Sequence, residues 1–233
     1  MLASPHHRNR LLSALSPADL ALLEPHLQPV PLKHRQELEK PHRKIETVYF
    51  VEVGIVSVVA IQSREWRAEV GLIGCEGMTG TSVVLGNEQS PHLSYVQIPG
   101  EALSIPAAEL RRAMAASESL RGLLLRYVQT FLAQTIHTAV CNAGAKIDQR
   151  LARWILMAHD RIPRDTVALT HEFLALMLGV RRASVSEALR EFSRQKLIEA
   201  KRGAIVVRNR KGIERIAGAS YGVPEAEYRR LIG

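Results

Sequence analysis

The chain has 233 residues, 46% of them hydrophobic, and 31 Lys and Arg against 23 Asp and Glu give it a formal net charge of +8. That length allows two modest domains with their own cores, and no apolar run approaches the roughly 18 residues of a membrane span. The first residues lack the apolar core of a secretory signal, and two cysteines cannot form a disulfide framework. We therefore expect a cytoplasmic protein that binds an acidic partner, nucleic acid before membrane.

Residues 9–27 are expected to form a small helical lead-in, since leucines supply apolar surface and Ser16-Pro17 marks a helix start. From 30 to 105 the pattern changes to short β-type runs, which lie at 47–53, 55–61, 68–73, 82–85, 93–98 and 102–105. Glycines separate these runs, and many short strands with close turn signals predict a sandwich or barrel. No strand–Gly loop–helix unit follows the glycines, which argues against a dinucleotide-binding unit.

A short helix at 107–116 and a long helix at about 117–143 follow the β-rich region. The residues of one stripe along the long helix follow one another at spacings of four and three, which is typical of a helix–helix interface. We predict that this stripe is the interface of a parallel homodimer, and its residues are Leu120, Leu124, Tyr127, Phe131, Gln134, Thr138 and Cys141. A second stripe beside it comprises Leu125, Val128, Leu132, Ile136 and Val140. One face would cover the β-rich domain while the other meets a partner helix; the alternative is a helix buried within one subunit.

Beyond the long helix, residues 142–144 are expected to form a hinge. Residues 146–160 are expected to form an amphipathic helix with Arg150 and Arg153 directed outward. At the end of the chain we expect at most a short helix at 213–217 and a polar terminal segment.

The stretch 169–207 predicts a winged helix-turn-helix. Thr170 is placed to cap a first helix, and Gly179 ends it because glycine favours the left-handed conformation at a helix terminus. A second helix at 181–195 has one buried stripe at spacings of four and three, formed by Val185, Leu189 and Phe192. Strands at 197–200 and 204–207 then form a basic hairpin.

The alternative to this motif is an αα-hairpin whose charged face only contacts solvent. The distribution of charge along the sequence argues against that alternative. Residues 181–211 contain ten Lys and Arg against three Glu, so nearly all the excess charge lies in one short segment, as expected of a phosphate-binding surface. The side chains expected to face the bases are Arg182, Ser184, Ser186 and Glu187. Those expected to position the phosphates are Thr170, His171, Arg181, Arg190, Lys201 and Arg202.

Over nearly its whole length the sequence resembles the Crp/Fnr superfamily of bacterial transcription regulators. The most specific matches are TVYFVEVGIVSVV (47–59), GCEGMTG (74–80), KIDQRLARWILMAHD (146–160) and LGVRRASVSEALREFSRQKLIEAKRGAIVV (178–207). The resemblance implies an α+β fold with a double-stranded β-helix (jelly-roll) sensor domain at 1–116, a dimerisation helix at 117–143 and a winged helix-turn-helix domain at 144–233. It also implies a homodimer on a palindromic operator in double-stranded DNA, with RNA polymerase as a further partner.

The family's recognition helix reads the major groove mainly through an Arg, a Glu and a second basic or polar position. Arg182 stands at the first position, but Ala183 occupies the Glu position and Glu187 that of the second Arg. The family's TGTGA-type half-site therefore cannot be carried over. Arg182 is expected to clasp a guanine edge, and Glu187 to accept from a cytosine amino group.

The effector pocket implied by the resemblance falls on Glu76, Gly77, Ser90 and His92. Cyclic-nucleotide-binding members hold the phosphate with an Arg-Ser pair, and here no Arg stands beside Ser90, so the strongest donor is missing; His92 would replace it only in part. Two cysteines cannot supply the four ligands of an iron–sulfur centre. Haem held by a histidine or Cys75, and a thiol switch at Cys75 or Cys141, remain alternatives. We expect no metal and no cofactor, with activity set by abundance alone as the plainest alternative.

Catalysis would need a nucleophile with its base, a carboxylate pair or a metal cluster, and the sequence contains no motif of these kinds. We therefore expect a protein that is not an enzyme. The other class considered is a nonspecific architectural DNA-binding protein, which would share the basic hairpin but would not need a sensor domain. A steep salt dependence with little sequence preference would favour that class, whereas a palindromic site would reject it.

Overall fold

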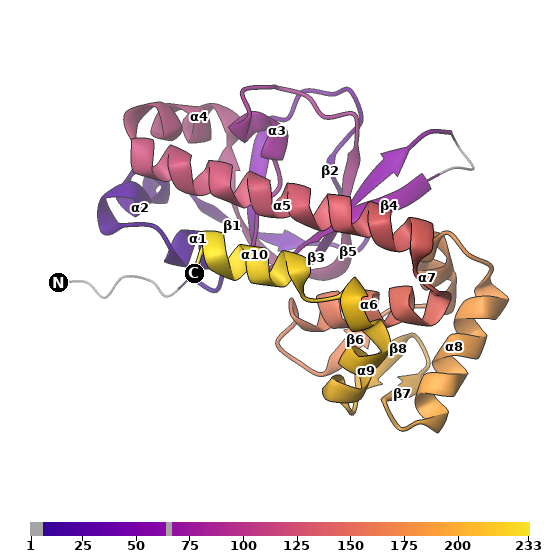
Figure 1. The fold of residues 1–233 in the computed structure, drawn as a ribbon. Coiled ribbons are helices and arrows are strands. Elements are labelled where there is room, and N and C mark those ends of the chain that lie inside the picture. The colour runs from indigo at the N-terminus through magenta and orange to yellow at the C-terminus, as the bar shows by residue number, and fades with distance from the viewer. Residues whose placement is uncertain (1–6, 64–66) are drawn as a thin grey trace.

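The computed structural model describes residues 7–63 and 67–233, in which a β-rich half, one long helix and a helical half follow one another along the chain (Figure 1). The N-terminal sheet contains strands β1 (Gln28–Leu32), β2 (Glu37–Glu39), β3 (Thr47–Ile61), β4 (Arg67–Ile73) and β5 (Leu93–Pro106). Its pairings are antiparallel, in the order β1-β5-β3-β4, with β2 also paired to β5. This arrangement confirms the predicted α+β class.

The two long strands, β3 and β5, each combine two runs that the glycine pattern predicts as separate strands. A Cβ atom on Gly54 would lie 2.6 Å from the carbonyl oxygen of Ile98, and one on Gly100 would lie 1.9 Å from that of Val53. The register between β3 and β5 shifts at this point. Glycine is therefore required for the close approach of two backbones at a bulge, and not for a chain reversal.

Short helices cover one end of the sheet. The predicted lead-in forms α1 (Arg10–Ser13), α2 (Pro17–Leu23) and a 3₁₀ turn (Glu24–His26), and the Ser16 hydroxyl accepts from the Asp19 N–H to cap α2. The run 82–85, predicted as a strand, is instead helix α3 (Thr81–Val84), which starts after Gly80 in the left-handed conformation. Helix α4 (Ala107–Ala116) has the predicted bounds.

Helix α5 (Glu118–Gly144) runs across the β-rich half, and its inner face is the stripe predicted as the dimer seam (Figure 1). That prediction is wrong, because this chain itself covers the stripe. Leu120, Leu124, Tyr127, Gln134 and Cys141 are buried, while Phe131 and Thr138 are half-buried. The Tyr127 hydroxyl donates to the Met78 carbonyl at 2.9 Å, and the amide of Gln134 bonds the backbone of Leu72 at 2.7 and 3.2 Å.

The outer face of α5 carries the second stripe. Leu125, Leu132, Ile136 and Val140 are 42%, 49%, 56% and 62% exposed. Heptad spacing identified both stripes, but it could not decide which of them meets the sheet, because each is apolar over the same length. Tyr127 and Gln134 settle the choice, since their polar atoms find backbone partners on the sheet side.

The C-terminal half begins with α6 (Ile147–His159), which follows α5 after Ala145 and Lys146. The predicted hinge at 142–144 is thus still helical. Three strands, β6 (Thr166–Ala168), β7 (Ile198–Lys201) and β8 (Ala204–Val207), form a sheet in the order β6-β8-β7, of which β6 had no sequence signal. Helices α7 (His171–Leu178) and α8 (Arg182–Arg194) lie between β6 and β7 in the chain.

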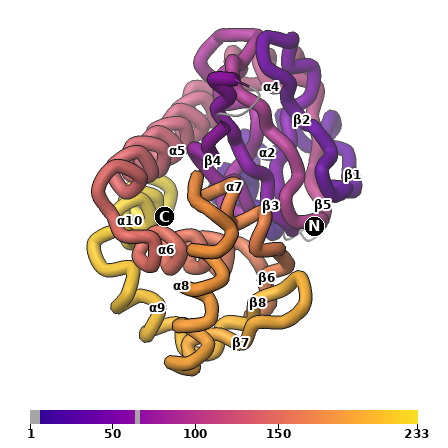
Figure 2. Tube along the Cα trace, turned by 90° about the vertical axis from the view of Figure 1, so that its right-hand side faces the viewer, coloured from indigo at the N-terminus to yellow at the C-terminus, as the bar shows by residue number. Residues whose placement is uncertain are grey.

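Two predictions for this half are wrong. Arg153 does not point outward: it is 6% exposed, and its Nη2 donates to the Thr138 hydroxyl of α5 at 3.0 Å. The terminal segment is not merely polar, because it forms α9 (Arg210–Ala217), a 3₁₀ turn (Gly218–Ser220) and α10 (Val223–Leu231). Helix α10 returns to the N-terminal half and packs along α5 (Figures 1 and 2). None of the described helices is long and apolar enough to cross a membrane.

Candidate nucleic-acid interface

The helix pair α7–α8 is fixed by its ends and by its buried side. The Thr170 hydroxyl accepts from the Phe173 N–H at 3.2 Å, and Gly179 takes a φ of 61° where α7 ends, as the sequence predicts. On α8 the buried side chains are Val185, Ala188, Leu189 and Phe192. The opposite side of α8 is therefore presented to solvent.

The outward side of α8 carries most of the side chains expected to read bases. Arg182 and Glu187 are exposed, whereas Ser184 and Ser186 are half-buried. Ser186 Oγ lies 2.9 Å from Nδ1 of His171, so this pair joins α8 to the start of α7. Arg182 Nη1 lies 3.2 Å from the carboxylate of Glu172, also on α7. Two of the side chains expected to read bases thus have partners on the neighbouring helix in the free protein.

The hairpin of β7 and β8 forms the wing. Its turn lies at Arg202-Gly203, where Gly203 has a φ of 73°, and Lys201 is the last residue of β7. Lys201 Nζ lies 3.4 Å from Glu199, which also pairs with Arg208. The wing therefore exposes Lys201, Arg202 and Arg208, of which Lys201 and Arg208 share the carboxylate of Glu199.

Several cations of the basic segment have no acidic partner. Arg194 pairs with Glu191, and Arg210 with Asp160, but Arg181, Arg190 and Arg202 are exposed and form no ion pair within residues 7–63 and 67–233. Guanidinium groups without an internal partner are available to phosphate oxygens. Helix α8 and the wing together thus offer an exposed cationic surface next to a polar helix face.

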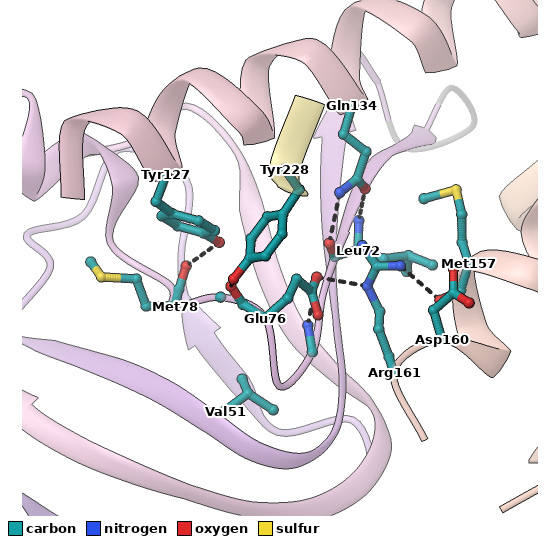
Figure 3. Close-up of polar contacts among 12 residues, drawn as sticks. Val51, Leu72, Glu76, Met78, Tyr127, Gln134, Met157, Asp160, Arg161 and Tyr228 are labelled. Carbon is teal, nitrogen blue, oxygen red and sulfur yellow. Dashed lines mark hydrogen bonds and ion pairs between the residues drawn. The ribbon is translucent and has the colours of Figure 1, made fainter. Parts of the chain in front are cut away.

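The predicted effector residue Glu76 is engaged inside the protein (Figure 3). Its Oε1 lies 2.7 Å from Nε of Arg161, which follows α6, and Arg161 Nη1 donates to the Met157 carbonyl at 2.7 Å. The Tyr228 hydroxyl of α10 donates to the backbone oxygen of Glu76 at 2.8 Å. This carboxylate of the expected effector pocket therefore links the β-rich half to the C-terminal half.

Gly77 serves the packing of α5. A Cβ atom at this position would lie 2.4 Å from the hydroxyl of Tyr127, so only glycine lets that helix approach. Ser90 and His92 bond within their own loop, where the Ser90 hydroxyl accepts from the His92 N–H at 3.1 Å. No hydrogen bond joins this loop to Glu76 or Gly77 in the described part of the chain.

Burial sets the charge of the other candidate effector groups. It lowers the pKa of His92 below its ordinary 6.5, so the ring is mostly neutral at pH 7 and supplies little charge for a phosphate. It raises the pKa of the half-buried Cys75, so the thiolate needed for a redox switch is disfavoured. Among the described residues, no group of three or more His, Cys, Asp and Glu side chains could hold a metal ion.

Two residue pairs join the halves of the molecule through contacts that the sequence does not indicate. Arg161 and Glu76 form the first. In the second, Trp154 Nε1 of α6 donates to Oε1 of Glu69 on β4 at 2.8 Å, and both side chains are buried. Each pair joins residues 85 positions apart, so neither lies within reach of a local pattern.

A family-model comparison identifies the region that contains the helix pair. Residues 149–216 match the family described as the Crp-like helix-turn-helix domain. These residues include α7, α8 and the wing, so the match covers the geometry described above. No curated protein sequence matches the chain.

Solved structures establish the fold of nearly the whole chain. FixK2 of Bradyrhizobium japonicum is similar at a TM-score of 0.68 and 17% identity, over 83% of this chain and 98% of its own. A Crp-family transcriptional regulator from Thermus thermophilus reaches 0.63 at 18% identity, over 83% and 99%. The c-di-GMP-responsive regulator CLP of Xanthomonas campestris reaches 0.62 at 17% identity, over 82% and 99%. These likenesses concern the fold alone.

Proposed function

We propose that this chain, whose residues 149–216 form a Crp-like helix-turn-helix domain within a Crp/Fnr-type fold, is a transcriptional regulator that binds a palindromic operator as a homodimer. The observation that carries the proposal is the outward side of α8, where Arg182, Glu187 and Arg190 are exposed on a helix whose other side is buried. Such a helix fits the major groove of B-DNA, with its side chains at base edges and phosphates. Arg202 on the wing is placed to add a phosphate contact.

The outer stripe of α5 supports the homodimer. Four large apolar side chains, each more than 40% exposed, follow one another over four turns of this helix. An apolar stripe at this spacing is the pattern of a helix that packs against a second helix. Two parallel copies of α5 would place two α8 helices in one dimer, as a two-fold operator requires. This face replaces the inner seam predicted from the sequence.

Charged substitutions on the outer stripe of α5 test whether this stripe is the dimer interface. Leu132→Lys with Ile136→Lys should convert the dimer into a folded monomer in sedimentation equilibrium, because two lysines on each helix would face two on the other. Leu22→Lys on α2 is the control, since Leu22 is an exposed leucine, at 37%, outside α5. A double variant that stays dimeric would exclude this face as the interface.

DNA reading can be tested by selection from a random duplex library at near-physiological salt. Enrichment of an inverted repeat with half-sites about one helical turn apart is the expected result. Retention of DNA without any enriched sequence, together with a steep salt slope, would instead support the architectural alternative. The same selection with the monomeric double variant should lose the repeat.

The proposal includes regulation that does not use a cyclic nucleotide, a metal or another resident cofactor. The pairing of Glu76 with Arg161 supports it, because this carboxylate of the expected effector pocket already has a buried cationic partner. A regulator of this type acts on DNA in the cytoplasm, with RNA polymerase as its further partner. Equilibrium dialysis with cyclic AMP tests the cyclic-nucleotide part, and saturable binding would contradict it.

A further inference from the structure

A cavity of about 520 Å³ lies between the N-terminal sheet and the first helix of the helix-turn-helix. Strands β3, β4 and β5 contribute one wall, and α7 contributes the other; Figure 2 shows α7 running beside β4 and β3. That volume is in the range of small-molecule sites, which commonly form between domains. The cavity is separate from Glu76, Gly77, Ser90 and His92, none of which lines it.

Much of the lining is apolar. The sheet provides Val59 and Leu93, and α7 provides Phe173, Leu176 and Met177. Leu176 is 49% exposed, whereas Leu174, Ala175, Met177 and Leu178 of α7 are buried, so an apolar body in the cavity would remove the Leu176 side chain from water. Burial of such surface favours a ligand with a hydrocarbon portion.

Two guanidinium groups stand in the same wall. Arg35 and Arg67 line the cavity, and neither forms an ion pair with any residue in 7–63 or 67–233. The backbone fixes Arg35 in the left-handed region, at a φ of 62°, and its N–H donates to the Val96 carbonyl at 2.8 Å. An exposed guanidinium that lacks an internal carboxylate is suited to a bidentate anion.

Gln97 adds a polar group without a partner. It is 4% exposed and lines the cavity from β5. Its Oε1 lies 2.5 Å from the Ser57 hydroxyl, while its Nε2 has no hydrogen-bond partner among the residues that the structure describes. Either orientation of the amide leaves one of its polar atoms unpaired. A buried amide atom without a partner is costly, and a polar ligand group would satisfy it.

We propose that this cavity binds a small organic carboxylate with an apolar body, its carboxylate at Arg35 and Arg67 and its hydrocarbon portion against Leu93, Phe173 and Leu176. Such a ligand touches the sheet and α7 together, and it would set how firmly the helix-turn-helix is held against the sensor sheet. The effect of the ligand on the helix-turn-helix rests on the proposed function, whereas binding of the ligand does not.

Three probes that differ only in their polar group test the binding. Isothermal titration calorimetry is done on the full-length protein with decanoate, decanol and decylamine, each below the concentration at which micelles form. Decanoate should bind, and decanol and decylamine should bind at least about tenfold more weakly. Arg35→Gln with Arg67→Gln should weaken decanoate by about tenfold or more while the melting temperature of the free protein stays unchanged. Arg43→Gln, an exposed arginine outside the cavity, should leave decanoate affinity as in the wild type. Leu176→Ser should weaken decanoate and decanol alike.

Several results would overturn the site. These are no decanoate binding up to about 1 mM, equal affinity for decanoate and decylamine, or decanoate affinity that the double arginine variant retains. With an operator from the selection, decanoate should change operator affinity at least threefold in the wild type and not in the double variant. An unchanged operator affinity with intact binding overturns the regulatory role alone. Loss of the operator in every condition would instead count against the proposed function, since calorimetry does not involve DNA.

Discussion

Arg182 of α8 and Glu172 of α7 form an ion pair in the free protein, with Nη1 3.2 Å from Oε1. The two side chains are 65% and 71% exposed, so the pair adds little to the stability of the fold. Its effect is on recognition, because it holds the guanidinium expected to reach a guanine against the first helix. DNA must therefore compete with a carboxylate for this side chain.

Removing that carboxylate should strengthen DNA binding. We expect Glu172→Gln to tighten operator binding by up to about fivefold, the equivalent of a surface pair of about 1 kcal/mol, since Arg182 becomes free and a charge that repels phosphate is lost. Fluorescence anisotropy with the selected operator measures the effect. In an Arg182→Ala background the gain should shrink to what charge repulsion alone contributes. An equal gain in both backgrounds would show that the pair does not restrain Arg182.

Loss of Arg182 itself should alter specificity. Arg182→Ala is expected to cost about 1–3 kcal/mol on the operator and to relax the preference at one base position, because the bidentate contact to a base edge disappears. Repeating the selection with the variant shows which position is relaxed. Equal loss of affinity on operator and random DNA would contradict a base-reading role.

Lys201 on the wing should act differently. Lys201→Ala is expected to weaken binding to all sequences alike and to lower the slope of log affinity against log salt by about one, as one phosphate contact is lost. Lys44→Ala is the matched control, since Lys44 is also an exposed lysine paired to a glutamate, but it lies on the N-terminal half. A sequence-dependent effect of Lys201→Ala would contradict the phosphate assignment.

Glu69 should make stability depend on pH. Its buried carboxyl group contacts the Ser57 hydroxyl at 2.6 Å and accepts from Trp154, and burial raises its pKa from 4.5 to about 7. Ser57 Oγ also lies 2.5 Å from Gln97 Oε1, and one hydroxyl hydrogen cannot serve both oxygens. A proton on Glu69 supplies the second hydrogen while that amide oxygen faces Ser57.

The raised pKa of Glu69 decides whether stability rises or falls with pH. The folded state holds this proton more tightly than the unfolded chain, so the contribution is complete below about pH 4.5 and is lost as pH rises through about 7. Relative to Glu69→Gln, the wild type should lose about 2.5 kcal/mol of unfolding free energy between pH 5 and pH 8. Urea unfolding at both pH values measures this difference. Glu101→Gln, at an exposed position on β5, should follow the wild type, and parallel curves for wild type and Glu69→Gln would contradict the prediction.

The buried pair of Glu76 and Arg161 should be sensitive to loss of one partner. The two side chains are 13% and 8% exposed, and Arg161→Met leaves the carboxylate without its cation, which is expected to cost about 3–5 kcal/mol of unfolding free energy. Glu76→Gln together with Arg161→Met should recover part of that loss, because no unpaired charge is left. Arg230→Met, which breaks the exposed pair with Glu227, should cost less than about 1 kcal/mol. Equal costs at the two sites would contradict a structural link between the halves.

Local signals in the sequence predict several elements correctly. Thr170 and Gly179 delimit α7 as predicted, because capping and left-handed turns depend on a few neighbouring residues. The apolar stripe of α8 follows the helical period, and Ser16 marks the start of α2. The Crp-like helix-turn-helix was recognisable for the same reason, since it is built from these short-range signals.

Which surfaces pack together could not be predicted from local patterns. Both stripes of α5 have the right spacing for a seam, and the one with Tyr127 and Gln134 faces the sheet because backbone groups of the sheet bond those side chains. Arg153 was expected at the surface, yet it is buried, because the Thr138 hydroxyl accepts a hydrogen bond from its guanidinium. Glu76 pairs with Arg161 for a similar reason. A buried polar group needs a partner, and that partner can come from any part of the chain that the fold brings near, which spacing along the sequence does not record.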